Sequence, residues 1–139
     1  MARSLRAFAH SCCNIQIHIV FVTKYRHPVL TQQIESDILA LCRSICEKNR
    51  CYLVEGKADL EMKDHIHLLI DLAPDVAIST IVNTMKTVTS REIRKRYVTE
   101  LKPFYWKPVF WKRGYCAVSS GGASLEVLKK YIEQQGRDD

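Results

Sequence analysis

Two histidines separated by one residue have the clearest capacity for chemistry in this sequence. His65 and His67 flank Ile66, and the run continues with Leu68 and Ile70. Such alternation predicts a β-strand, in which side chains two residues apart point to the same face. The two imidazoles would stand about 7 Å apart at the backbone, close enough to reach one metal ion together. Histidine pairs also occur on strands that bind nothing, so the tripeptide alone leaves a metal site a hypothesis.

A second group of candidates lies near the end of the sequence. Tyr131 and Gln135 are four residues apart in a stretch with helical spacing, so both would lie on one helix face. An amide oxygen is a suitable ligand for a hard divalent ion, and a tyrosine hydroxyl is a nucleophile. A nearby metal ion would help this hydroxyl, with an ordinary pKa of about 10, to attack a phosphate. A helical Tyr-x-x-x-Gln is common on protein surfaces, so this pair alone leaves a catalytic role for Tyr131 a hypothesis.

The composition is that of an ordinary soluble globular chain with an excess of positive charge. The 139 residues are 47% hydrophobic, and the net charge is +6, which favours a polyanionic partner. No apolar run approaches the roughly 20 residues of a membrane span, and the basic N-terminus lacks a signal-peptide stretch. We therefore expect a cytoplasmic protein without membrane association. The six cysteines match no zinc module, and we expect apolar fillers in a reducing compartment.

The pattern of the chain predicts one α+β domain over residues 1–139, with residues 1–12 as a flexible arm. The expected elements begin with a strand over 14–22, a helix that starts near Thr31 and runs to about Lys48, a strand from 51 to about 58, and the histidine strand. A helix from 75, a short strand over about 114–119 and a tyrosine-bearing helix over 123–135 follow. The first six have the order of the split βαβ, or ferredoxin-like, fold. This fold is an antiparallel sheet with helices on one face and the other face open.

In that fold the strand over 14–22 and the histidine strand are central neighbours. Their alternation puts Gln16 and His18 on the same open face as His65 and His67. Gln16 and His18 are therefore candidates to support the histidine pair. For His18, a plain surface position is an equal alternative.

Cationic and aromatic side chains gather in three further segments. In the helix after residue 75 the cations form either a phosphate-binding face or a solvated helix face. Residues 104–113 interleave aromatic rings with cations, which suits stacking on single-stranded bases, although Phe110 and Trp111 are expected in the core. The strand end over 24–26 is also basic. The candidate DNA contacts are Lys24, Tyr25, Arg26, Lys86, Arg91, Arg94, Lys95, Lys112 and Arg113.

Taken together, these motifs resemble a known family. The His65–His67 strand matches the His-hydrophobe-His (HUH) signature. The segments 22–30, 110–115 and 131–135 look like those of the IS200-like group, the single-tyrosine transposases of the smallest bacterial insertion sequences. The similarity runs from about residue 14 to residue 135, so it covers nearly the whole chain.

The resemblance implies an enzyme that cuts and rejoins single-stranded DNA, with hairpin ends of the element as substrate. Tyr131 would be the nucleophile and form a covalent link to a 5′-phosphate, and His65, His67 and Gln135 would bind magnesium or manganese. The family works as a homodimer that can exchange the tyrosine helix between subunits. Gly121 and Gly122, just before the tyrosine helix, would then form the hinge for this exchange. An ordinary turn would use the two glycines equally well.

Other functions remain open at this stage. Close relatives in mechanism are a domesticated repeat-associated tyrosine nuclease and a replication-initiator nickase, and the short length and single tyrosine favour the transposase over the initiator. A non-catalytic ferredoxin-like binder of single-stranded nucleic acid would need neither the histidine pair nor Tyr131. A metal-dependent phosphoesterase for small molecules would leave the positive charge unexplained.

Overall fold

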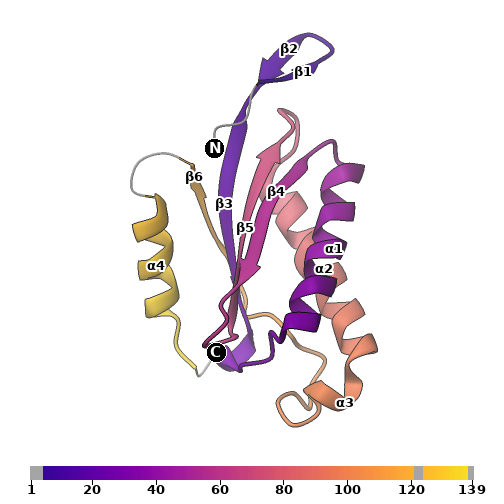
Figure 1. The fold of residues 1–139 in the computed structure, drawn as a ribbon, viewed down its shortest axis with the longest axis vertical. Coiled ribbons are helices and arrows are strands. Elements are labelled where there is room, and N and C mark those ends of the chain that lie inside the picture. Colours follow the sequence, from indigo (N-terminus) through magenta and orange to yellow (C-terminus); the bar gives the residue numbers. More distant parts are fainter. Residues whose placement is uncertain (1–4, 121–123, 138–139) are drawn as a thin grey trace.

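A four-stranded antiparallel sheet forms the centre of the molecule (Figure 1). The structure, a computed structural model, describes residues 5–120 and 124–137. The strands are β3 (Ile15–Val22), β4 (Tyr52–Ala58), β5 (His65–Leu72) and β6 (Cys116–Ser119), in the spatial order β4-β5-β3-β6. The helices α1 (Gln32–Lys48) and α2 (Ile78–Arg96) pack on one face, and α4 (Ser124–Gln134) lies on the other face, against β6 and β3. The predicted α+β, ferredoxin-like sheet is confirmed.

The main core lies between the sheet and the two long helices. Ile19 and Phe21 of β3, with Ile66 and Leu68 of β5, are completely buried there. Burying one such side chain contributes about 1.5–3 kcal/mol. The helix α1 starts where its sequence predicts, because the Thr31 hydroxyl accepts a hydrogen bond of 3.3 Å from the amide nitrogen of Ile34.

The cysteines act as small apolar residues. All six are free thiols, and Cys42, Cys46 and Cys51 are buried in the main core. Burial raises the pKa of Cys42 and of Cys46 to about 12, so both thiols stay protonated at neutral pH. None of the described helices has both the length and the apolar character needed to cross a membrane.

The N-terminal segment, predicted as a flexible arm, contains regular structure. The strands β1 (Arg6–Phe8) and β2 (Ser11–Cys13) form a hairpin that projects beyond one end of the sheet (Figure 1). Arg6 ties it down through an ion pair of 3.2 Å with the buried Asp71 and a hydrogen bond of 3.0 Å to the carbonyl of Arg50. Strands of three residues are too short to show a periodic pattern, so the sequence could not reveal them.

Two helical details also differ from the expected pattern. The long helix α2 starts after Ala77 rather than at Asp75, and no side chain caps it. The Asp75 carboxylate instead binds the guanidinium of Arg50. A 3-10 turn η1 (Lys24–Arg26) and a short helix α3 (Val98–Leu101) were not expected. The expected hinge glycines, Gly121 and Gly122, lie outside the described residues.

The second face of the sheet is only half open. Val20 and Val22, on the same face as His18, are 1% and 2% exposed, and Leu128 of α4 packs on them. Cys116 and Val118 of β6 and Tyr131 and Ile132 of α4 complete this small second core. The helix α4 therefore covers the β3–β6 half of the face and leaves the β4–β5 half accessible.

We predict that Leu128 anchors α4 on the sheet. Leu128→Ala should remove about 2 kcal/mol of packing free energy, which corresponds to roughly 30-fold faster amide exchange in α4 through local opening. Hydrogen–deuterium exchange followed by mass spectrometry measures this rate. Leu125→Ala is the matched control, since Leu125 lies on the same helix but is 64% exposed. Equal exchange rates in the two variants would contradict the prediction.

Candidate functional site

The histidine pair lies on β5 beside the region that α4 covers. His65 and His67 point to the face opposite the buried Ile66, as the alternation predicts. Across the antiparallel β3–β5 pair, His65 stands opposite Val22 and His67 opposite Val20. Both imidazoles are half-buried, so they are fixed by neighbours and still accessible to a ligand.

A buried carboxylate orients His65. Asp64 is fully buried, and its Oδ1 lies 2.8 Å from His65 Nδ1 while its Oδ2 accepts a hydrogen bond of 3.0 Å from Arg26 Nε. Burial by itself would raise the pKa of Asp64, but the hydrogen bond from His65 and the charge of Arg26 outweigh it and hold this pKa below its usual value. The ionised carboxylate accepts a hydrogen bond from Nδ1–H of His65, which leaves the lone pair on Nε2 of His65 for a ligand.

His67 contacts another histidine. Its Nε2 lies 2.7 Å from Nδ1 of His18, and the two rings are stacked with an interplanar angle of 15°. Burial, with His18 close by, lowers the pKa of His67, which favours a neutral imidazole that is able to bind a cation. His18 thus lies directly against the histidine pair. Gln16 pairs with Asp71, further along the strand.

Tyr131 lies on the same face as the histidines. Its half-buried ring packs in the second core with Val20 and Val22, the two residues that pair with His67 and His65. Burial, with a smaller effect of Cys116, raises the pKa of Tyr131 above its usual value. The phenol is therefore neutral at neutral pH and needs a nearby positive charge or a base to become a nucleophile.

Gln135 follows the last turn of α4. Its side-chain Nε2 donates a hydrogen bond of 3.0 Å to the carbonyl of Tyr131, and its own carbonyl accepts one of 3.1 Å from Nη1 of Arg26. The side-chain amide oxygen remains as the group that suits a cation. Within residues 5–120 and 124–137, no three His, Cys, Asp or Glu side chains form a metal-binding group. Two imidazoles and one amide oxygen would leave positions of a divalent ion open for substrate oxygens.

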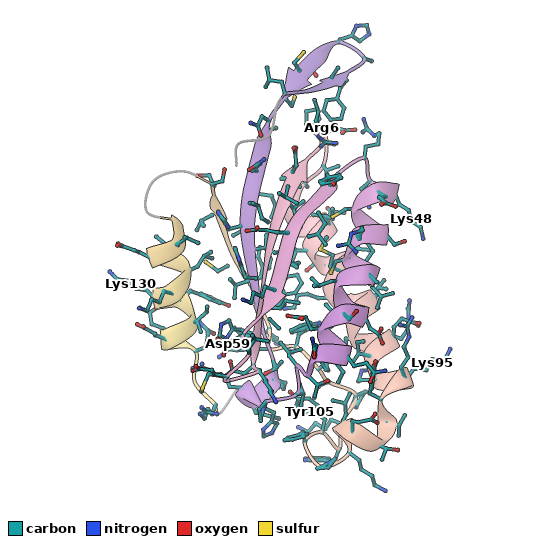
Figure 2. The ribbon with its side chains drawn as sticks, in the orientation of Figure 1. Arg6, Lys48, Asp59, Lys95, Tyr105 and Lys130 are labelled. Atoms are coloured by element: carbon teal, nitrogen blue, oxygen red, sulfur yellow. The ribbon has the colours of Figure 1, made fainter. Side chains whose placement is uncertain are left out.

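A cavity of about 530 Å³ opens beside the histidine pair, on the accessible half of the sheet. Its polar lining includes Lys57, Asp59 and Glu61 as well as both histidines. Lys57 stands directly opposite His67 across the β4–β5 pair, so its ammonium faces the same side. Lys57 was not among the candidates from the sequence, although the alternation of its strand relative to His67 contains the signal. Figure 2 shows Asp59 near the lower end of the sheet, the end at which Tyr105 also lies.

Two cations that were expected to contact DNA are engaged within the protein. The side chain of Arg26 is 13% exposed and binds Asp64 and Gln135. The ammonium of Lys86 donates hydrogen bonds of 2.8 Å and 2.6 Å to the carbonyls of Lys112 and Gly114, and burial lowers the pKa of Lys86 to about 8. Lys86 thus secures the loop that leads into β6, and neither residue forms a free cationic surface.

The other expected contacts lie on two surfaces. A second cavity of about 340 Å³ between α2 and the loop before β6 has a polar rim of Thr87, Ser90, Arg94, Lys112 and Arg113. Arg91 and Lys95 are exposed elsewhere on α2, while Lys24 and Tyr25 lie on η1. Phe110 and Trp111 belong to the main core, as expected, but Trp106 is 85% exposed with the ammonium of Lys107 at 4.9 Å from its ring centre.

Several transposases are similar to this chain in sequence. It is 28% identical over 121 residues to the ISDra2 transposase TnpA of Deinococcus radiodurans. This alignment covers 87% of this chain and 84% of that protein. It is also 28% identical over 134 residues to the transposase for insertion sequence element IS200 of Salmonella typhimurium. This second alignment covers 96% of this chain and 85% of that protein.

Two solved structures share the fold. A crystal structure of a candidate transposase from Deinococcus radiodurans has a TM-score of 0.82 at 24% identity and covers 94% of this chain and 98% of that chain. A REP-associated tyrosine transposase bound to a REP hairpin has a TM-score of 0.54 at 13% identity. The superposition covers 96% of this chain and 67% of that chain. The model of the family described as IS200-like transposases matches residues 11–135, and this chain therefore belongs to that family.

Proposed function

We propose that this transposase cleaves and rejoins single-stranded DNA through a covalent bond between Tyr131 and a 5′-phosphate. One observation carries the proposal most strongly. Tyr131 packs against the second core formed by Val20, Val22 and Leu128. Val20 and Val22 pair with His67 and His65, so the proposed nucleophile and the two imidazoles share one face of the sheet. The cavity beside the histidines offers space for the phosphate and its nucleotide.

The proposed ligands are His65, His67 and the amide oxygen of Gln135, which fit magnesium or manganese by the chemistry of their donor atoms. When bound, the ion supplies positive charge that polarises a phosphoryl oxygen and favours ionisation of the nearby phenol. Asp64 contributes by holding the His65 ring with Nε2 outward. His67 presents Nε2 once the hydrogen bond with His18 gives way, or Nδ1 if that hydrogen bond persists.

The proposed chemistry conserves the energy of the broken bond. The phenolic oxygen of Tyr131 loses its proton to solvent and attacks the phosphorus, while the bond to the 3′ oxygen breaks and that oxygen takes up a proton. The product is a 5′-phosphotyrosine and a free 3′-hydroxyl. Attack of a 3′-hydroxyl on the phosphotyrosine reverses the step and rejoins a strand.

The proposed substrate is single-stranded DNA with hairpin ends, bound by a homodimer in the cytoplasm. A transposase of similar fold is bound to a REP hairpin, which supports hairpin DNA as the partner. In the structure α4 packs on the sheet of its own chain. A dimer that exchanged α4 between subunits would place the same residues on the same valines, so either arrangement assembles the proposed site.

We predict that Tyr131→Phe abolishes the covalent adduct. The variant loses only the nucleophilic oxygen, so binding of DNA should persist while the slower-migrating protein–DNA species disappears from a denaturing gel. The substrate is single-stranded DNA from the flanks of the gene, with magnesium or manganese. Tyr52→Phe, on the exposed start of β4, is the control and should form the adduct normally. An adduct in Tyr131→Phe would show that another group attacks, and binding without any adduct in the unaltered protein would favour a non-catalytic binder.

Loss of the proposed metal ligands should weaken cation binding before any reaction. We predict that His65→Ala and His67→Ala each bind Mn²⁺ at least about 100-fold more weakly and that a chelator abolishes the adduct. Calorimetry on DNA-free protein measures the affinity. His10→Ala, in the turn of the N-terminal hairpin, is the control and should bind Mn²⁺ normally. Unchanged affinity in both site variants would exclude the pair as ligands.

Charge and stacking should contribute separately to DNA binding. Arg113→Ala should lower the slope of log affinity against log salt by about 0.7, the value for one phosphate contact of a single strand. Trp106→Ala should weaken binding about 5- to 150-fold, from about 1–3 kcal/mol of stacking, without changing that slope. Fluorescence anisotropy at several salt concentrations measures both effects. Arg43→Ala on α1 is the exposed control, and an equal slope change in it would refute a localised contact at Arg113.

A further inference from the structure

Arg26 lies between the two parts of the proposed site and binds both. Its Nε donates a hydrogen bond of 3.0 Å to Oδ2 of Asp64, at the start of β5. Its Nη1 donates one of 3.1 Å to the carbonyl of Gln135, just after α4. One guanidinium thus joins the histidine strand to the end of the tyrosine helix.

On the β5 side, Arg26 contacts the side chain that orients His65. Asp64 is fully buried, so the positions of its two oxygens depend on the side chains that donate hydrogen bonds to them. Because the other oxygen of Asp64 binds Nδ1 of His65, the guanidinium and the imidazole share one carboxylate. A displacement of Arg26 therefore changes what holds the His65 ring.

On the α4 side, Arg26 serves as a cap. The last carbonyls of a helix lack internal partners and carry partial negative charge, so a guanidinium there is favourable. The amide of Gln135 donates a hydrogen bond of 3.2 Å to the carbonyl of Ile132, which tightens the last turn and directs the Gln135 carbonyl toward Arg26. Arg137 adds a contact in the opposite direction, from its Nη1 to the carbonyl of Arg26 at 3.4 Å.

The turn that carries Arg26 has an unfavourable backbone conformation. Tyr25 and Arg26 have φ values of 60° and 52°, the left-handed region that disfavours residues with a side chain. Surrounding contacts maintain it, because the Thr23 hydroxyl binds the carbonyls of His27 and Asp64 and the Tyr105 hydroxyl donates to the carbonyl of Lys24. The turn directs the guanidinium into the gap between β5 and α4 rather than toward solvent.

We propose that Arg26 is a positioning residue that couples docking of the tyrosine helix to the orientation of His65. When α4 is docked, the Gln135 carbonyl and Asp64 together fix the guanidinium, and Asp64 fixes His65. When α4 leaves, Arg26 loses one of its two partners, and the hold on His65 weakens. The catalytic meaning of this coupling rests on the proposed function, but the coupling itself is a property of the DNA-free protein.

Coupling between two sites is reciprocal. If docking of α4 orders His65, then a cation bound at the histidines must favour docking of α4 by the same factor. In the unaltered protein, Mn²⁺ should therefore slow amide exchange in α4, and typical coupling free energies predict an effect of roughly 5- to 150-fold.

The test is hydrogen–deuterium exchange of the full-length protein with and without Mn²⁺. Arg26→Ala should accelerate exchange in α4 about ten-fold and reduce the protection that Mn²⁺ provides to the part that direct binding of the ion by Gln135 supplies. Arg26→Lys keeps the charge beside Asp64, but its single ammonium lacks the forked geometry that spans both partners. It should therefore retain the fold and show the same reduced Mn²⁺-dependent protection, which also decides the question if Arg26→Ala does not fold. Arg43→Ala, an exposed arginine on α1, should behave like the unaltered protein.

Protection of α4 by Mn²⁺ that is unchanged in Arg26→Lys and in Arg26→Ala would overturn the proposal, and so would the absence of any Mn²⁺ effect in the unaltered protein. This result is independent of the DNA reaction. If the coupling is present and Tyr131 forms no adduct, the proposed nuclease function fails and the role of Arg26 stands. If the adduct forms and the coupling is absent, the nuclease function stands and the role of Arg26 fails.

Discussion

The register between β3 and β5 is the constraint on which the rest of the site depends. Side chains alternate along a strand, so a slip of one residue would move the histidines into the core and Ile66 to the surface. The cost of exposing the aliphatic face prevents such a slip. The same register sets His65 opposite Val22 and His67 opposite Val20, and α4 packs on these two valines. Hydrophobic packing in the core thus determines where Tyr131, the proposed nucleophile, lies relative to the imidazoles.

Hydrophobic packing brings Asp64, His65 and Arg26 close together, and their charges and hydrogen bonds then orient them. The carboxylate of Asp64 is fully buried, so it depends on Arg26 and His65 as hydrogen-bond donors. The three side chains form a hydrogen-bonded network that extends through Arg26 to the end of α4. Such a network holds a histidine in one orientation before any ligand arrives, which reduces the reorganisation needed on binding.

Local patterns in the sequence were sufficient for the sheet and for the main helices. The alternation around His65 and in residues 14–22 reflects a strand buried on one face, and this physical cause acts within a few residues. The start of α1 near Thr31 also has a local cause, because the Thr31 hydroxyl accepts a hydrogen bond from the amide of Ile34. The same pattern also indicates that the second face is partly covered, since Val20 and Val22 fall on the polar face with His18. Two adjacent apolar positions on that face required a cover, and α4 is the cover.

The parts that could not be predicted depend on contacts between residues far apart in the chain. From the sequence alone, Arg26 and Lys24 are alike: both are predicted to be solvent-facing cations at the end of a strand. The left-handed backbone at Tyr25 and Arg26 has no signature when neither residue is glycine, and it turns one cation inward. Its partners, Asp64 and Gln135, lie 38 and 109 residues away. Lys86 differs from its neighbours on α2 for the same reason, because two carbonyls of a distant loop bind it. A count of basic residues along the chain therefore does not reveal which cations are already bound by acceptors of the same protein.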